Sequence, residues 1–89
     1  MQIRKTARFK SDFRRMAKRG QNISALENVL EILTSGQPLP AFYHDHILHS
    51  GDMKGVHDAH LAPDWVLLYE IQGETLVLYR TGTHSDLNL

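Results

Sequence analysis

Hydrophobic residues recur along the first half of this chain with the period of an α-helix. Residues 7–19 carry an apolar stripe at intervals of three and four, and Gly20 follows as a C-terminal stop. A second stripe precedes Gly36, and Ser24-Ala25-Leu26-Glu27 fits a capping box, in which serine and glutamate satisfy free backbone amides. Two consecutive helices, joined into a hairpin, are therefore expected. The stripes consist of Phe9, Phe13, Met16 and Ala17, and of Leu26, Val29, Leu30 and Leu33.

The second half of the chain has continuous apolar runs that are typical of strands. Residues 65–69 and 76–79 are apolar throughout, and Gln72-Gly73-Glu74 between them is a tight-turn signal. Antiparallel strands are therefore predicted at about 65–72 and 74–81, with others at about 53–60 and 2–6. Prolines 38 and 40 start a connecting segment that runs through residue 51. The order β-α-α-β-β-β predicts a two-layer α+β domain, with the helical hairpin packed on a mainly antiparallel sheet.

The length and composition limit the possible classes of protein. The 89 residues are expected to form a single domain, 1–89, whose core is too small to house a large cofactor. The chain has no cysteine, which excludes a disulfide framework and a thiolate metal site. Its N-terminal region is polar and basic, and no apolar run resembles a signal peptide or a membrane span. A soluble, cytoplasmic protein without a cofactor or membrane partner is expected.

The net charge of zero conceals a strong division along the chain. Residues 1–22 carry eight basic side chains and one acid, a net charge of +7, whereas residues 23–89 carry a net charge of −7. A helix this basic is suited to binding nucleic-acid phosphates or an acidic partner protein. The alternative is a solvated helix face. The residues predicted to form the binding surface are Arg8, Lys10, Arg14, Arg15, Lys18 and Arg19.

The histidines of the C-terminal half suggest acid–base chemistry. Cleavage of RNA by its own 2′-hydroxyl needs a base, an acid and a cation that steadies the phosphorane, and histidine titrates near neutral pH. His60 closes one predicted strand, Asp64 opens the next, and His84 follows the last. In an antiparallel meander these three positions lie at the same rim of the sheet. The predicted proton-transfer residues are these three, His60, Asp64 and His84, together with His46, and the predicted substrate-binding residues are Lys54, Trp65 and Arg80.

Each of these residues also has a simpler interpretation. Trp65 alone is more typical of a core residue than of a base-stacking platform, and Arg80 could pair with an acid on a neighbouring strand. The segment His44-Asp45-His46, with His49, raises the alternative of a metal site. Its spacing matches none of the strong metal-binding signatures, so no metal ligands are predicted.

Several short motifs at these positions resemble the YafQ-like branch of the RelE/ParE toxin superfamily. They are L-P-x-x-Y-x-D-H from residue 39, D-A-H-x-x-P-D-W from residue 58 and R-T-G-T-H from residue 80. The resemblance implies a RelE-like fold and an endoribonuclease that cuts messenger RNA on the translating ribosome. It places the active-site histidines and aspartate at 46, 60, 64 and 84, with His84 as the general acid, and leaves the general base open. His57 stands where related toxins carry arginine, and Tyr79 is a second departure.

The resemblance also implies the partners of the protein. These are a cognate antitoxin, the ribosome with its rRNA, and mRNA, with a higher-order toxin–antitoxin hetero-oligomer that binds operator DNA through the antitoxin. The alternative function is that of ParE-like relatives, which bind DNA gyrase and lack a histidine-rich site. Loss of activity with retention of antitoxin binding is a third hypothesis.

Overall fold

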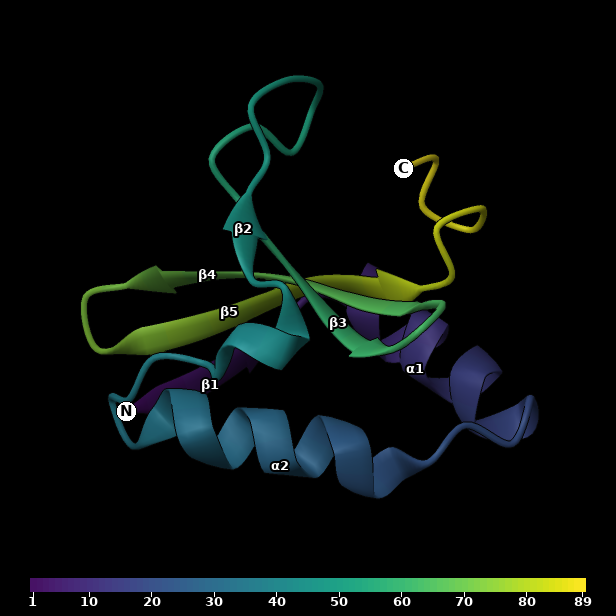
Figure 1. Cartoon of the computed structure of the whole chain (residues 1–89), viewed down its shortest axis with the longest axis horizontal. Helices are drawn as coiled ribbons and strands as arrows, with labels where there is room; N and C mark the ends of the chain where they lie inside the picture. Colours follow the sequence, from purple (N-terminus) through teal and green to yellow (C-terminus); the bar gives the residue numbers. More distant parts are fainter.

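The protein, described for all residues 1–89 by a computed structural model, has two layers (Figure 1). Two helices cover one face of a five-stranded sheet with the order β1-β5-β4-β3-β2. Strand β1 runs parallel to β5, and all other neighbours are antiparallel. The predicted α+β class is confirmed. In chain order the elements are β1 (Gln2–Lys5), α1 (Ala7–Lys18), α2 (Ile23–Thr34), the 3₁₀ helix η1 (Ala41–Tyr43), β2 (His46–Ile47), β3 (His57–Ala62), β4 (Trp65–Gln72) and β5 (Thr75–Gly82).

Local hydrogen bonds fix the ends of both helices. Helix α1 begins after Thr6, whose Oγ1 accepts from the backbone N–H of Phe9 at 3.0 Å, and it ends before Gly20, which has φ of 85°. The predicted capping box of α2 is wrong. Asn22 caps this helix instead, because its Oδ1 accepts from the N–H of Ser24 at 3.1 Å. Each helix has 12 residues, and neither is long and apolar enough to cross a membrane.

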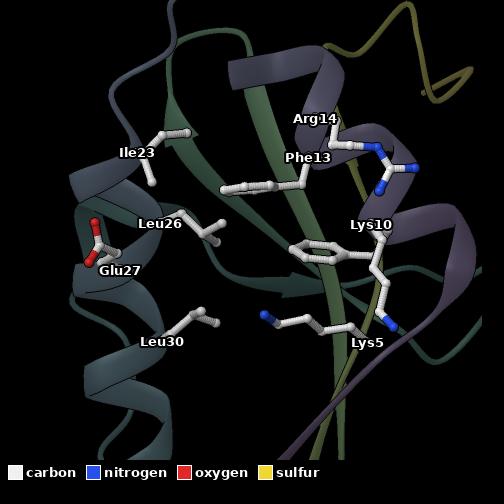
Figure 2. A pocket seen from close by; sticks show the side chains of 9 residues that line it. Lys5, Lys10, Phe13, Arg14, Ile23, Leu26, Glu27 and Leu30 are labelled. Atoms are coloured by element: carbon white, nitrogen blue, oxygen red, sulfur yellow. The ribbon is translucent and has the colours of Figure 1, made fainter. Parts of the chain in front are cut away.

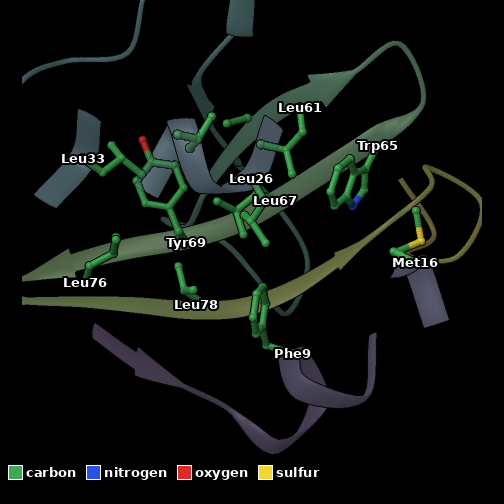
Figure 3. Close-up of a cluster of buried hydrophobic side chains, with 12 residues drawn as sticks. Phe9, Met16, Leu26, Leu33, Leu61, Trp65, Leu67, Tyr69, Leu76 and Leu78 are labelled. Carbon is green, nitrogen blue, oxygen red and sulfur yellow. The ribbon is translucent and has the colours of Figure 1, made fainter. Parts of the chain in front are cut away.

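The core fills the space between the helices and the sheet (Figure 3). Trp65, Leu67 and Tyr69 alternate along β4 and point to this side, where they meet apolar side chains of both helices. The apolar stripes predicted from the sequence supply the helical part of the core, in particular Phe9, Met16, Leu26, Val29 and Leu33. The intervening residues of β4 lie on the opposite face, which no helix covers.

Strand β2 and the start of β3 differ from the prediction. Residues 52–55 form turns, so β3 begins at His57 rather than near residue 53. The predicted connecting segment contains η1 and the two-residue strand β2, which pairs with Asp58 and His57. A pair this short has no periodicity of its own in the sequence. It brings His46 beside β3.

A groove separates α1 from α2 on the outer side of the helical layer (Figure 2). Its volume is about 370 Å³, and its walls are apolar side chains from both helices, such as Phe13 and Leu30. Lys10 and Arg14 lie on the α1 side of the groove and Glu27 on the α2 side, and Lys5 extends across one end of it toward Leu30 (Figure 2). The hairpin therefore leaves an apolar groove with basic side chains on its α1 side.

Candidate active site

The structure brings the predicted rim residues together. The ring Nδ1 of His84 lies 2.8 Å from Asp64 Oδ1, and the backbone N–H of His84 donates to the same oxygen at 3.0 Å. The ring centroids of His60 and His84 are 5.1 Å apart. These hydrogen bonds from His84, first from its backbone and then from its ring, hold the pKa of the Asp64 carboxyl below its usual value. Asp64 therefore stays ionised and orients His84.

A turn after β5 holds His84 in this place. Asp86 Oδ2 accepts from the backbone N–H of Thr83 at 3.0 Å, and Thr83 Oγ1 accepts from the N–H of Asp86 at 3.0 Å. Arg19, the C-cap residue of α1, donates to Asp86 at 2.7 and 3.3 Å. The hydrogen bond from Arg19, followed by that from the backbone of Thr83, holds the pKa of Asp86 well below its usual range. The first helix thus anchors the segment that carries His84.

His46 approaches His60 and His84 from the other side of β3. His44 adopts a left-handed backbone conformation with φ of 51°, and its carbonyl oxygen lies 2.8 Å from His46 Nδ1. A non-glycine residue in this region is strained, and such residues are concentrated at functional sites. The ring centroids of His44 and His46 lie 5.5 and 6.3 Å from that of His60. We refer to His44, His46, His60 and His84 as the histidine cluster.

A buried carboxylate lies beneath the histidine cluster. Asp58 is only 3% exposed, and its Oδ1 is a buried side-chain oxygen without a hydrogen-bond partner. Oδ1 lies 3.6 Å from His60 Nε2, and Oδ2 lies 3.8 Å from His46 Nε2. A buried carboxylate is costly without a compensating charge, and these two rings are the nearest groups that could supply one. Sequence reasoning missed it, although its position two residues before His60 on a strand predicts the same face.

His57 points away from the histidine cluster. Its ring stacks on that of Tyr69 at a centroid distance of 4.8 Å, and its Nδ1 lies 3.0 Å from Asp45 Oδ1. The hydroxyl of Tyr69 donates to Asp45 Oδ2 at 2.7 Å. Burial and this hydrogen bond raise the pKa of Tyr69. His57 therefore fastens the segment between η1 and β2 to the sheet, on the face opposite the Asp58 carboxylate.

Arg80 is bound to a buried acid of the first helix. Its Nε and Nη2 donate to Asp12 at 2.6 and 3.2 Å, and the backbone N–H of Thr81 also donates to Asp12, at 3.2 Å. Strand β1 pairs with β5 only as far as Leu78, and beyond that point Asp12 takes the place of the missing strand as acceptor. The hydrogen bonds that Arg80 donates to Asp12 raise the pKa of Arg80. Arg80 thus retains only part of its guanidinium for a substrate.

None of the three residues predicted to bind substrate belongs to the histidine cluster. Trp65 is fully buried at 0% exposure, and its Nε1 donates to Thr81 Oγ1 at 2.7 Å, so the prediction that it contacts substrate is wrong. Its core interpretation is correct. Lys54 is exposed in the loop between β2 and β3, which rises from the sheet (Figure 1).

The predicted basic surface is only partly free of other contacts. Arg15 pairs with Asp12 at 2.7 Å and Arg19 pairs with Asp86, whereas the remaining cations of α1 form no ion pair. The side chains that remain available to a polyanion are those of Arg8, Lys10, Arg14 and Lys18.

The alternative metal site in the loop is not formed. His44 and His46 turn toward His60, whereas Asp45 turns toward His57 and Tyr69. No group of three or more histidine, aspartate or glutamate side chains is arranged to hold a metal ion.

A helical hairpin on this sheet, with histidines and carboxylates gathered at one rim, agrees with the RelE-like class of toxin that the sequence motifs resemble. Comparison with known proteins narrows the class. The family described as "Bacterial toxin of type II toxin-antitoxin system, YafQ" matches residues 1–89. The chain belongs to this YafQ family.

Three relatives illustrate the relation. The mRNA interferase toxin YafQ of Escherichia coli strain B / BL21-DE3 is 38% identical over 86 residues, which cover 96% of this chain and 92% of the relative. The structure of the E. coli DinJ–YafQ complex matches with a TM-score of 0.85 and 38% identity, covering 96% of this chain and 94% of the other. A metal-bound toxin from Helicobacter pylori matches with a TM-score of 0.87 and 36% identity, over 98% of both chains.

Proposed function

We propose that this chain is an mRNA interferase, an endoribonuclease that cleaves messenger RNA by attack of the RNA's own 2′-hydroxyl without a metal ion. Family membership supports the reaction class, because a relative with 38% identity is an mRNA interferase toxin. Membership of this family gives no support to the alternative hypothesis, a ParE-like toxin that binds DNA gyrase. The observation that carries the mechanism is the histidine cluster, in which His46 and His84 are each held through Nδ1.

His46 acts as the general base. A carbonyl oxygen only accepts, so the contact with His44 fixes the proton of neutral His46 on Nδ1 and leaves a lone pair on Nε2. Nε2 takes the proton of the 2′-hydroxyl, and the imidazolium that forms faces Asp58 Oδ2 at 3.8 Å. Asp64, the other open candidate, is less suited to this role because its Oδ1 already accepts two hydrogen bonds from His84.

His84 acts as the general acid. Asp64 accepts from Nδ1 and stabilises the protonated ring, so the proton on Nε2 is available to the departing 5′-oxygen. The 2′-oxygen bonds to phosphorus, the bond to the 5′-oxygen breaks, and the products are a 2′,3′-cyclic phosphate and a free 5′-hydroxyl. His60 lies between the two and donates to the charged phosphorane oxygens.

In this proposal, the phosphate backbone of the RNA continues from the histidine cluster into a groove of about 610 Å³. It lies between the β2–β3 loop and the C-terminal residues, and Arg8 and Arg80 line it. Its floor includes Leu68, the cross-strand neighbour of Asp58 and of Arg80. The groove is therefore one strand away from the carboxylate beneath the cluster. Arg80 Nη1, which has no partner in the protein, is suited to a phosphate oxygen.

The partners are the ribosome, mRNA and a cognate antitoxin, and the reaction takes place in the cytoplasm on translated messages. The free cations of α1 are suited to rRNA phosphates, whose contacts position a protein without reading sequence. A relative is seen in complex with the antitoxin DinJ. The groove of Figure 2, which is apolar with basic side chains on its α1 side, is suited to an amphipathic acidic segment of such an antitoxin.

The test is induction of the wild type and of His84→Ala in a bacterial host, with RNA ends mapped against the reading frame. The wild type should produce cuts in a fixed frame within translated messages. His84→Ala should cleave purified ribosome-bound message about 10²–10⁴-fold more slowly, because alanine offers no proton to the leaving oxygen. The matched control is Ser85→Ala, an exposed neighbour in the same segment. Wild-type cleavage by folded His84→Ala would refute the assignment, and intact RNA in the wild type would refute the function.

A further inference from the structure

A second cavity, of about 620 Å³, opens beside the histidine cluster at the outer edge of β3. Residues of α2, of η1 and of the turn between β3 and β4 form its walls. His44 and His60 belong both to this wall and to the cluster. The cavity is therefore continuous with the proposed reaction centre.

An exposed aromatic side chain forms one wall of this cavity. Phe42 is 69% exposed, more than any other large hydrophobic residue of the protein, and it belongs to neither core cluster. Its ring lies against that of Tyr43, with centroids 4.3 Å apart, and Tyr43 packs on the core. Tyr43 therefore fixes the place of Phe42, whose exposed surface gains nothing for folding. An exposed, fixed aromatic surface next to a cleavage centre is suited to stacking.

The cavity also offers hydrogen-bonding groups. Strand β2 pairs only with His57 and Asp58, so the later residues of β3 have no partner strand on their outer edge. Backbone groups at such an edge are able to bind an extended or planar ligand. The exposed carboxamide of Asn28, from α2, lines the same cavity and both donates and accepts. An aromatic face combined with donors and acceptors matches the two surfaces of a nucleobase, its ring plane and its polar edge.

We propose that this cavity binds the base of a nucleotide next to the scissile phosphate, with the base stacked on Phe42 and its edge read by Asn28 and the free edge of β3. The inference rests on the proposed function and extends it to base selection. The volume lies within the range of small-ligand sites, about 300–1,000 Å³, and accommodates one base. A phosphate held at His60 brings the adjoining base to this cavity, because His60 lines both.

The test uses a trinucleotide with 2′-O-methyl groups, which binds without being cleaved because it has no free 2′-hydroxyl. Backbone and carboxamide ¹H–¹⁵N signals are followed during titration of the wild type, Phe42→Ala, Phe42→Tyr, Asn28→Ala and Ile71→Ala. Ile71 is an exposed apolar residue of β4 outside both the cavity and the cluster, and it serves as the matched control. Phe42→Ala should weaken binding by roughly 5- to 150-fold, whereas Phe42→Tyr and Ile71→Ala should bind like the wild type.

The signals that shift distinguish the sites. Shifts at residues 59–62 and at the Asn28 carboxamide support the inference, and Asn28→Ala should alter the relative affinities for trinucleotides of different base. Equal affinity of Phe42→Ala and the wild type, or shifts confined to the groove lined by Arg8 and Arg80, would overturn it. The absence of shifts in the wild type would do the same. Because the probe is not cleaved, these results are independent of whether the chain cuts RNA, which the His84→Ala experiment decides.

Discussion

Asp12 is expected to stabilise the fold through one of its two arginines and not through the other. It is the single acid of the basic first helix and is 3% exposed. Arg80 reaches it with two nitrogens from β5 and is 21% exposed, whereas Arg15 reaches it with one nitrogen from the helix surface and is 42% exposed. Because both arginines bind the same carboxylate, any difference between the two interaction energies reflects the burial and geometry of the arginine.

The expected energies follow from this difference. Asp12→Ala leaves Arg80 and the N–H of Thr81 without their acceptor and should cost about 3–5 kcal/mol, the range for breaking a buried pair. Asp12 and Arg80 should be coupled by about 1.5–3 kcal/mol, as for hydrogen bonds between charged groups. The exposed pair with Arg15 should be coupled by less than about 1 kcal/mol. A domain of this length has roughly 4–13 kcal/mol of stability in total, so the loss is a large share of it.

The assay is urea unfolding of the single and double variants, with the coupling energy taken from each double-mutant cycle. Asp12→Asn serves as a second variant where Asp12→Ala does not fold, because it keeps the shape of the side chain. Equal coupling for the two arginines, or a loss below about 1 kcal/mol for Asp12→Ala, would refute the reasoning. Arg80 would then be free to act mainly on the substrate.

Three further outcomes are expected. Asp58→Asn should keep the fold but slow cleavage by about 10²-fold, because the imidazolium of His46 loses its countercharge; unchanged kcat would contradict this role. Cleavage should survive EDTA when ribosome integrity is controlled, and mapped ends should carry 5′-hydroxyl groups; 5′-phosphate ends or rescue by added metal would indicate a metal-dependent reaction instead. Because the pKa of Asp86 is lower in the folded than in the unfolded protein, its ionised form stabilises the fold above the unfolded pKa, about 4. This stability is lost as the pH falls toward the folded pKa. The melting temperature of Asp86→Asn should therefore decline less on acidification than that of the wild type.

The helices, the strands and most of the site could be predicted because their signals are local. Apolar stripes placed both helices, and continuous apolar runs placed β4 and β5 to within one residue. The gathering of His60, Asp64 and His84 followed from the meander alone, since the end of one strand and the start of the next must adjoin. The capping box failed because two neighbouring polar residues, Asn22 and Ser24, both suit a cap, and the motif does not rank them.

The residues that were missed depend on contacts between distant parts of the chain. Strand β2 exists because Asp45 binds His57 and Tyr69, which lie 12 and 24 positions away. The sequence does contain a signal for Asp12, because this acid lies three residues after Phe9 and four before Met16, within the apolar stripe of α1. An acid in that position indicates a buried partner but does not identify Arg80 of β5 as that partner.

The pairing of the first strand with the last has a consequence for synthesis of the protein. β1 leaves the ribosome first, yet its hydrogen-bonding partner is β5. Gln2 therefore cannot pair with Thr75 until β5 has been synthesised. The histidine cluster is also completed late, because His84 is synthesised after every helix and strand that positions it. Contacts this distant in sequence form late in folding. A nascent chain therefore has no assembled histidine cluster until residue 84 has left the exit tunnel, so the four rings come together only at the end of synthesis.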